Sequence, residues 1–345
     1  MKLGITYNLK SDVTPAGGEP DDRYEEFDSE ETISSIEAAL HHLGHDVIRL
    51  GWGAPMLDRI FEIRKKGQRL DGVFNLAEGV GGRGRESQVP ACLEMLGIPF
   101  TGSDALTLAL ALDKSMAKRM ASSHGIRTAP FRVISSLSEL DELDLTYPLF
   151  VKPALEGSSM GITDQSLCPD RAAIRGRVPR MLSDYGPVLV EEFLPGDEFT
   201  VGIVGNGDQA RVLGTMQVTP RQAKSDFVYS LEMKRNYRDL IEYIIPPRIA
   251  PAALAEVEKL ALDAFRVFGC NDVTRVDIRN NRDGRPSFIE MNPLPGMNPS
   301  SSDLIILARG YGVSYEDVIG AVVGAAEKRW RENGHPTRIS QRPLS

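Results

Sequence analysis

The chain has 345 residues, of which 41% are hydrophobic and 26% are charged, and its formal net charge is −8. This length predicts two or three units that each bury a core, and the composition excludes a fibrous or wholly disordered protein. No apolar run is long enough to span a bilayer, and no signal-peptide pattern follows the first methionine. The acidic balance lacks a basic cluster, which argues against nucleic acid as a partner. We therefore expect neither a membrane nor a nucleic-acid partner.

The cysteines indicate the redox environment. Cys92, Cys168 and Cys270 are widely spaced and form no C-x-x-C pair. This spacing argues against a disulfide framework and against a zinc ribbon, and it is typical of proteins in a reducing compartment. We therefore expect a cytoplasmic location.

The first hundred residues alternate between strand and helix patterns. The expected strands are 2–7, 45–50 and 72–76, and the expected helices are 30–43, 54–66 and 86–96. The polar stretch from Lys10 to Ser29 is expected to form a long surface loop, with Asp28 or Ser29 capping the first helix. Strands that alternate with helices indicate a parallel sheet covered by helices. This predicts an α/β unit over residues 1–102.

The pattern changes after residue 102 to one typical of an α+β fold with hairpins. A single helix is expected over 104–124, ended by Gly125, and further helices are expected over 251–268 and 315–332. The expected strands are 131–134, 148–152, 161–163, 188–190, 199–204, 273–279 and 286–292. A turn signal at 280–284 joins the last two strands into a hairpin.

Two glycine-rich motifs match familiar sites but lie in the wrong context. Gly79, Gly81 and Gly84 fit the G-x-G-x-x-G pattern of an NAD-dependent oxidoreductase. That pattern normally follows the first strand of its unit and here follows the third, so a flexible glycine-rich loop is the simpler interpretation. A G-x-S-x-G match at 157–161 suggests a serine hydrolase. That nucleophile elbow needs a strand, a turn and a helix, whereas strands are expected on both sides of this turn.

A group of histidines near one helix end is the remaining weak motif. His41, His42 and His45 lie at the end of the first expected helix. Because the helix dipole favours cations there, a solvated helix end is the simpler interpretation than a metal site.

The sharpest chemical signal comes from the last two expected strands. Side chains alternate along a strand, so one face of the first carries Arg275, Asp277 and Arg279. One face of the second carries Phe288, Glu290 and Asn292. A hairpin would place these sets side by side. Two carboxylates and an amide oxygen suit magnesium, which keeps positions open for phosphate oxygens. A hairpin with one solvated face is the structural alternative.

Other segments favour phosphate chemistry. Residues 293–301 are rich in proline and small residues, so their backbone N–H groups are able to approach a ligand closely. Lys152 lies in an apolar strand, where a lysine is either a snorkelling edge residue or a phosphate ligand. The turn at 157–161 is free to lie across phosphates. The linker at 191–198 offers backbone groups to an adenine and a carboxylate to ribose hydroxyls.

Taken together and in this order, the motifs resemble the ATP-grasp superfamily, and most closely the D-alanine–D-alanine ligase family, over about residues 70–320. The resemblance is carried by 71–75, 97–103, 111–114, 150–161, 190–199, 275–277 and 290–297. It implies an α/β plus α+β architecture, in which a Rossmann-like pre-ATP-grasp domain precedes an ATP-grasp fold. The implied domains are 1–102, 103–186 and 187–335, with a lid at about 220–245 and a tail at 336–345.

The resemblance also implies an activity and a set of site residues. The activity is ADP-forming ligation of a carboxylate to an amine through an acyl phosphate, with amino acids or related small molecules as substrates. It implies ATP, two Mg²⁺ ions with Mn²⁺ as a substitute, and a homodimer. The implied metal ligands are Asp277, Glu290 and Asn292. The implied ATP contacts are Lys114, Lys152, Ser158, Ser159, Glu191, Glu192, Leu194, Glu198 and Lys234. The groups implied to act on the reacting atoms are Arg275, Gly296, Ser158 and Lys234.

The amino-acid site departs from the family pattern. The family's amino-terminal signature is absent, and Glu30 or Glu31 is expected to replace its amino-group-binding glutamate. Glu78 stands where the family usually has histidine, and Arg235 where it has tyrosine. These two charges are expected to pair with each other or to meet opposite charges on the substrate, which would make D-alanine with D-alanine a poor pair. Ser301 completes the expected substrate contacts.

Three alternatives stay open. The chain is a true D-alanine–D-alanine ligase of peptidoglycan synthesis if Glu78 and Arg235 both point to solvent. A nucleotide-binding protein without turnover is less favoured, because Lys152, Asp277 and Glu290 are all present. The oxidoreductase is the alternative from a different enzyme class.

Overall fold

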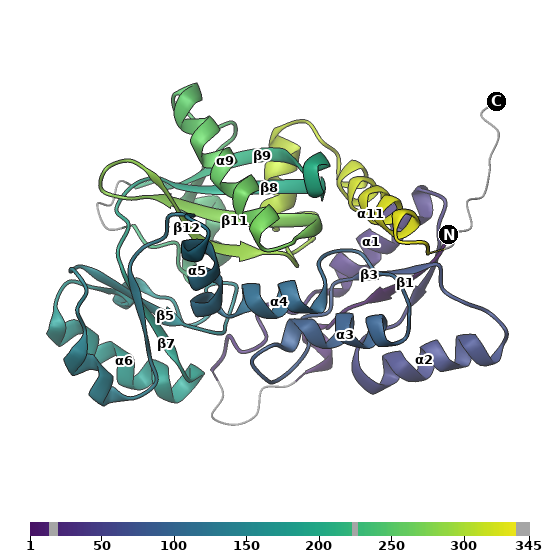
Figure 1. Ribbon diagram of the computed structural model, residues 1–345, viewed down its shortest axis with the longest axis horizontal. Helices are drawn as coiled ribbons and strands as arrows, with labels where there is room; N and C mark the ends of the chain where they lie inside the picture. The colour runs from purple at the N-terminus through teal and green to yellow at the C-terminus, as the bar shows by residue number, and fades with distance from the viewer. Residues whose placement is uncertain (14–19, 223–226, 336–345) are drawn as a thin grey trace.

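The computed structural model describes residues 1–13, 20–222 and 227–335, and these residues form three sheets (Figure 1). The amino-terminal sheet has the order β2-β1-β3 and is parallel, as predicted. Its strands are β1 (Lys2–Thr6), β2 (Asp46–Arg49) and β3 (Gly72–Asn75). The helices of this unit are α1 (Glu30–His42), α2 (Gly53–Lys65) and α3 (Gln88–Met95). The side chain of Ser29 caps α1 by accepting from the N–H of Thr32.

The segment expected to be one helix over 104–124 is divided in two. Helix α4 (Ala105–Leu112) ends at Asp113, which begins helix α5 (Lys114–Ser123). The Asp113 carboxylate accepts hydrogen bonds from the N–H groups of Ser115 and Met116. Aspartate is among the best N-cap residues because its short side chain satisfies such free donors. The break places Lys114 in the first turn of α5.

The central sheet is antiparallel and has the order β4-β7-β5-β6, with helix α6 (Arg171–Tyr185) packed against it. Its strands are β4 (Phe131–Ile134), β5 (Leu149–Pro153), β6 (Leu167–Cys168) and β7 (Val188–Glu192). Because β7 lies between β4 and β5, the predicted boundary between 186 and 187 falls one strand too early. The strand expected at 161–163 does not form, and a short 3-10 helix, η4 (Asp164–Ser166), follows instead.

The carboxy-terminal sheet is antiparallel and has the order β10-β9-β8-β11-β12. Its strands are β8 (Glu198–Asn206), β9 (Arg211–Pro220), β10 (Ile241–Ile244), β11 (Asn271–Asn280) and β12 (Pro286–Asn292). Helix α9 (Pro251–Val267) packs with α5 in one apolar cluster against it. Helices α10 (Asp303–Gly310) and α11 (Tyr315–Glu332) belong to another cluster, which also contains residues of α1, β1 and β3.

A buried polar contact joins the amino-terminal unit to the carboxy-terminal sheet. Asp272 of β11 is fully buried, and its carboxylate accepts from the N–H of Gly102 and the guanidinium of Arg329. The indole of Trp330 donates to the carbonyl of Phe100. These contacts hold α11 between the two units, where Figure 1 shows it beside α1. The amino-terminal unit is thereby joined to the carboxy-terminal sheet through buried hydrogen bonds.

Two findings bear on expectations from composition. Cys92, Cys168 and Cys270 carry free thiols. No helix within the described ranges combines the length and apolar character that crossing a bilayer requires.

Candidate active site

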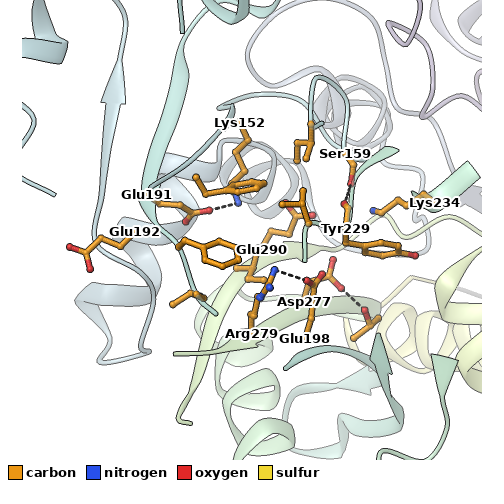
Figure 2. Close-up of a pocket in the computed structure, with 17 residues that line it drawn as sticks. Lys152, Ser159, Glu191, Glu192, Glu198, Tyr229, Lys234, Asp277, Arg279 and Glu290 are labelled. Atoms are coloured by element: carbon orange, nitrogen blue, oxygen red, sulfur yellow. Dashed lines mark hydrogen bonds and ion pairs between the residues drawn. The ribbon is translucent and has the colours of Figure 1, made fainter. Parts of the chain in front are cut away.

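Two cavities lie next to each other between the sheets. Figure 2 shows the first, where side chains of the central and carboxy-terminal sheets face one another. The second, of about 390 Å³, is lined by the carboxy-terminal sheet, the segment after β12 and residues 25–29 of the amino-terminal unit. Lys234 and Tyr229 line both cavities. A group bound in one is therefore close to a group bound in the other.

The β11–β12 hairpin supplies the predicted carboxylates. Asp277 pairs with Glu290, and Arg275 pairs with Asn292 across the two strands. Asp277 and Glu290 line the first cavity, whereas Arg275 and Asn292 line the second. The predicted ligand set is therefore assembled where the cavities meet.

One detail of this hairpin was predicted wrongly. The register shifts beside Ile278, which pairs with Phe288, so Ile289 is an extra residue in β12. Such a bulge reverses the face on which the following residues lie. Ile289 lines the first cavity with Glu290, and Phe288 is buried in the core instead of sharing that face.

Cations surround the carboxylate of Glu290. The Lys114 ammonium lies 3.0 Å from it. Burial would raise the pKa of Glu290, but Lys114, Lys152, Lys234 and Arg275 outweigh burial and lower the pKa well below its usual range. The Asp277 carboxylate accepts from Arg275 and from the hydroxyl of Thr200. The Asn292 side chain makes no hydrogen bond within residues 1–13, 20–222 and 227–335. The carboxylates of Asp277 and Glu290, together with the unbonded amide of Asn292, offer the oxygen ligands that a divalent cation prefers.

Lys152 is held by a buried ion pair that the sequence interpretation did not include. The Glu191 carboxylate lies 2.7 Å from the ammonium groups of both Lys152 and Lys118. All three side chains are buried. Lys118 was missed, although its position four residues after Lys114 places both lysines on one face of α5. The Glu191 side chain thus orients Lys152, which lines the first cavity, and Lys118 behind it.

Acid should weaken the fold through this carboxylate. Burial would raise the pKa of Glu191, but Lys118 and Lys152 outweigh it and lower the pKa to about 2 from 4.5. A folded-state pKa below the unfolded one stabilises the fold above the unfolded pKa, and that stabilisation is lost as the pH falls toward the folded value. We expect a loss of roughly 3 kcal/mol between about pH 5 and pH 2.

Urea unfolding measured across this pH range tests that expectation. In Glu191→Gln, the free energy of unfolding should fall less steeply as the pH is lowered from about 5 to 2. Glu332→Gln changes an exposed carboxylate of α11 and should show the same fall as the parent protein. If the free energy of unfolding falls equally steeply in Glu191→Gln and in the parent protein, Glu191 is not the source of the acid sensitivity.

The linker between β7 and β8 forms one wall of the first cavity. Glu192, Leu194 and Glu198 line it, as expected for ATP contacts. The Arg279 guanidinium lies 3.2 Å from the Glu198 carboxylate and 4.7 Å from the ring centre of Phe193. This cation also donates to backbone carbonyls of Gly196 and Phe227. Arg279 therefore fixes the linker, a role the strand pattern did not indicate.

The turn at 157–161 lies over both cavities. Ser158 and Ser159 adopt positive φ angles of 46° and 58°, which are uncommon outside glycine. Ser158 lines the second cavity and Ser159 the first. The Ser159 hydroxyl donates to the carbonyl of Tyr229. This contact connects the turn to the segment expected to form a lid.

The lid segment is only partly a separate element. It contains the short helices α7 (Leu231–Arg235) and α8 (Tyr237–Leu240), but residues 241–244 form strand β10 of the carboxy-terminal sheet. Residues 223–226 lie outside the described residues. The Lys234 ammonium lies 5.0 Å from the ring centre of Tyr229, at the junction of the cavities. Movement of this segment stays a prediction.

The second cavity carries the groups expected to act on the reacting atoms. The Arg275 guanidinium is buried and contacts the carboxylates of Asp277 and Asp303. Tyr229 and Tyr243 both donate toward Asp303, which fixes that carboxylate. Gly296 lines the same cavity, and a Cβ there would lie 2.9 Å from the Ser302 hydroxyl. Asp303 and the two tyrosines were not anticipated, because strand alternation says nothing about residues from other elements.

The predicted substrate contacts are only partly placed in this cavity. Glu78, Arg235 and Ser301 line it. Arg235 and Glu78 do not pair with each other, because the Arg235 guanidinium lies 2.7 Å from Glu25 instead. Glu30 and Glu31 lie outside the cavity, and Glu30 forms a surface ion pair with Arg49. The expectation that one of them faces the site is wrong. The preceding loop supplies the carboxylates instead, because Glu25, Glu26 and Asp28 line the cavity.

Comparisons with known proteins support the resemblance. Residues 120–324 match a family model described as the D-ala D-ala ligase C-terminus. A D-alanine–D-alanine ligase of Cupriavidus metallidurans is 35% identical over 81% of this chain and 83% of its own length. The structure of a D-alanine–D-alanine ligase from Bacillus anthracis complexed with ATP has a TM-score of 0.69 at 22% identity, covering 97% of this chain and all of that one. A D-Ala:D-Ser ligase from Enterococcus faecalis has a TM-score of 0.71 at 22% identity, covering 94% of this chain and 99% of that one.

The structural likeness shows the fold, and the sequence identity over most of both chains shows the family. The predicted α/β plus α+β ATP-grasp architecture is thereby confirmed. The chain belongs to the D-alanine–D-alanine ligase family and is an ATP-grasp ligase that forms a C–N bond.

Proposed function

We propose that this ligase joins two amino acids, or closely related small molecules, in an ADP-forming reaction that proceeds through an acyl phosphate. The observation that carries this proposal is the junction of the two cavities. Asp277 and Glu290 face one cavity, and Arg275 and Asn292 face the other from the same hairpin. A γ-phosphate bound in the first cavity is then within reach of a carboxylate bound in the second.

The first cavity suits ATP. Glu192, Leu194 and Glu198 would contact the adenosine, while Lys152 and the turn at Ser158 and Ser159 would contact the phosphates. Lys114 would join Lys152 beside the phosphates, because its ammonium already lies against Glu290. Asp277, Glu290 and Asn292 would hold Mg²⁺, as one or two ions with Mn²⁺ as a substitute, which would neutralise phosphate charge during transfer.

The second cavity suits the reacting carbon. The Arg275 guanidinium and the N–H of Gly296 would stabilise the oxyanion formed when an amine attacks the acyl phosphate. Ser158 lies on the same cavity and would orient the attacking group. Lys234, which lines both cavities, would stabilise the phosphoryl group while it passes from ATP to the carboxylate. These steps depend on positioning and charge, as is usual for phosphoryl transfer.

The names of the relatives favour a narrower second candidate. The Cupriavidus protein is called a D-alanine–D-alanine ligase, which supports D-alanyl-D-alanine synthesis for peptidoglycan as this chain's activity. An oxidoreductase has no support in a family of ATP-grasp ligases. We further propose a cytoplasmic homodimer, which the free thiols and the family resemblance support.

A screen of amino-acid pairs for phosphate release, followed by mass analysis of the products, tests the proposal. The protein should form ADP only when Mg²⁺, ATP and a productive pair are present, and the product should have the mass of a dipeptide. D-alanine with D-alanine belongs in the panel, because a product from that pair at the highest rate would establish the narrower candidate. Absence of ADP formation with every pair would contradict the proposal.

A further inference from the structure

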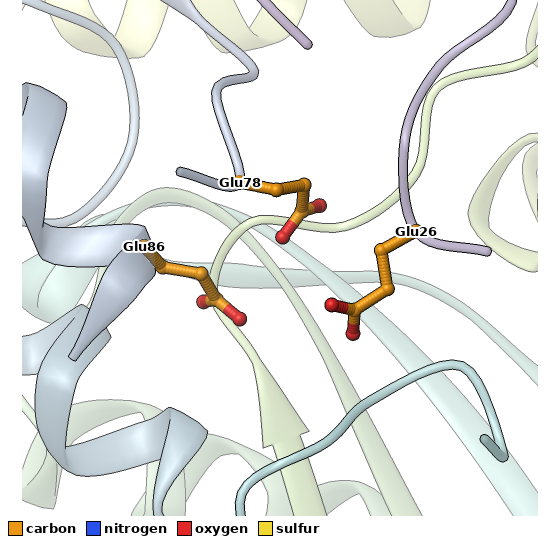
Figure 3. Close-up of side chains that lie close together, drawn as sticks. All are labelled: Glu26, Glu78 and Glu86. Carbon is orange, nitrogen blue, oxygen red and sulfur yellow. The ribbon is translucent and has the colours of Figure 1, made fainter. Parts of the chain in front are cut away.

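The part of the second cavity that the amino-terminal unit lines is rich in carboxylates. Glu26 and Glu78 line the cavity. Figure 3 shows the carboxylates of Glu26, Glu78 and Glu86 turned toward one another. Carboxylate oxygens of the three residues lie within 4.8 Å of one another. They come from three separate segments, since Glu26 precedes α1, Glu78 follows β3 and Glu86 lies just before α3. The fold therefore brings these acids together from distant parts of the chain.

Among the residues that the structure describes, Arg85 is the cation in contact with this cluster, and it pairs with Glu26 but not with Glu78 or Glu86. Arg85 pairs with Glu26 and also contacts Glu156 at 3.4 Å. Glu86 is only 5% exposed, yet it makes no hydrogen bond and no ion pair with any described residue. Glu78 is equally without such a partner in the described ranges. Glu86 is buried and Glu78 is half-buried, so holding both as carboxylates without a cation is costly. The cluster therefore favours a further positive charge beside Glu78 and Glu86.

The protonation of the cluster agrees with a missing cation. Burial raises the pKa of Glu86 to about 8, and Glu26 adds to the effect while Arg85 and Lys114 oppose it. Burial also raises the pKa of Glu78 well above its usual range, with Glu26 and Glu86 adding to the effect. Raised pKa values favour proton binding by these carboxylates, and a positive charge placed beside them would lower the pKa values again.

Another carboxylate of this cavity, that of Asp28, is able to bind the α-amino group that every amino acid carries. Asp28 lines the same end of the cavity, and burial raises its pKa to about 7 while Lys10 opposes the effect. Arg235 does not neutralise the cluster, because its guanidinium is ion-paired with Glu25. The cavity thus has acidic groups for two separate cations, whereas an amino acid with an apolar side chain supplies one.

We propose that the second cavity binds an amino acid whose side chain carries an ammonium or guanidinium group, and that Glu26, Glu78 and Glu86 hold this group. The inference rests on the proposed function, because it takes the second cavity as the amino-acid site. It specifies the substrate class for that site: a basic amino acid in place of one with a methyl side chain.

Calorimetric binding of lysine and norleucine, each as both enantiomers, tests this inference. The two amino acids have side chains of similar length and differ in the terminal ammonium group. With Mg²⁺ and a non-hydrolysable ATP analogue, one enantiomer of lysine should bind at least about tenfold more tightly than the same enantiomer of norleucine. Binding of lysine should also release protons, seen as a dependence of the heat on the buffer.

Matched variants assign the effect to the cluster. Glu78→Gln and Glu86→Gln should each reduce the preference for lysine over norleucine to less than threefold. Glu62→Gln, at an exposed carboxylate of α2, should keep the full preference. Thermal unfolding and binding of the ATP analogue show whether each variant is folded.

Each contrary result has a definite meaning. Equal binding of lysine and norleucine, or tighter binding of D-alanine than of both, would overturn the inference. Tight binding of Mn²⁺ or Ca²⁺ that Glu78→Gln abolishes, without a preference for lysine, would replace it with a metal site. If D-alanine is the only amino acid of the panel that supports ADP formation, the inference is overturned and the ligase proposal stands. Preference for lysine without ADP formation from any pair would contradict the ligase proposal instead.

Discussion

Replacing Glu290 by glutamine is expected to lower turnover by about 10³-fold or more while the protein stays folded. The substitution keeps the shape of the side chain and removes the charge that Lys114 contacts at 3.0 Å. A neutral amide is a poorer ligand for a divalent cation, and the lysines around the phosphates lose the carboxylate that balances them. Both changes raise the barrier to phosphoryl transfer.

Steady-state ADP formation with the best pair from the screen measures this effect. Glu62→Gln serves as the matched control, since the same change on the surface of α2 should leave turnover within about twofold. Thermal unfolding of Glu290→Gln should be cooperative and begin at a lower temperature than in the parent, because Lys114 loses its buried partner. Near-normal ADP formation by a folded Glu290→Gln protein would refute the metal assignment.

Replacing Arg275 by methionine is expected to lower kcat by about 10²- to 10³-fold, because oxyanion donors contribute about 3–4 kcal/mol in comparable sites. Arg275 is buried in the second cavity, so the affinity for ATP in the first should change little. The substitution also leaves Asp277 and Asp303 without their shared cation, which should destabilise the fold.

A second variant separates catalysis from folding. Arg275→Lys keeps a positive charge between Asp277 and Asp303 but loses the planar guanidinium and its several N–H donors. It should unfold at nearly the parent temperature and still show a reduced kcat, with unchanged binding of an ATP analogue. If Arg275→Lys retains the parent kcat, the guanidinium does not stabilise the oxyanion.

The sequence was most informative where chemistry follows from local periodicity. Strand alternation predicted that Asp277, Glu290 and Asn292 would share one face of a hairpin, and the strand register confirms that they lie together. The alternating elements of residues 1–102 likewise predicted the parallel sheet. Both inferences need only the period of a strand and the turn signals around it.

The features that were missed depend on contacts between distant elements. Nothing near β7 in the sequence shows that this strand inserts between β4 and β5, so the domain boundary was misplaced. The bulge at Ile289 changes one pairing and reverses the face of Phe288. Glu86 reaches Glu78 and Glu26 only after three segments pack together, so the acidic end of the second cavity was visible only in three dimensions.

Transfer of ¹⁸O from the first amino acid tests the central claim most directly. The amino acid that donates its carboxylate is labelled with ¹⁸O in both oxygens, and the phosphate released with ADP is analysed by mass. An acyl-phosphate route predicts one ¹⁸O atom in each inorganic phosphate formed, because the carboxylate oxygen that attacks the γ-phosphorus leaves with the phosphate when the amine attacks. Unlabelled phosphate together with a normal ligation product would contradict the account.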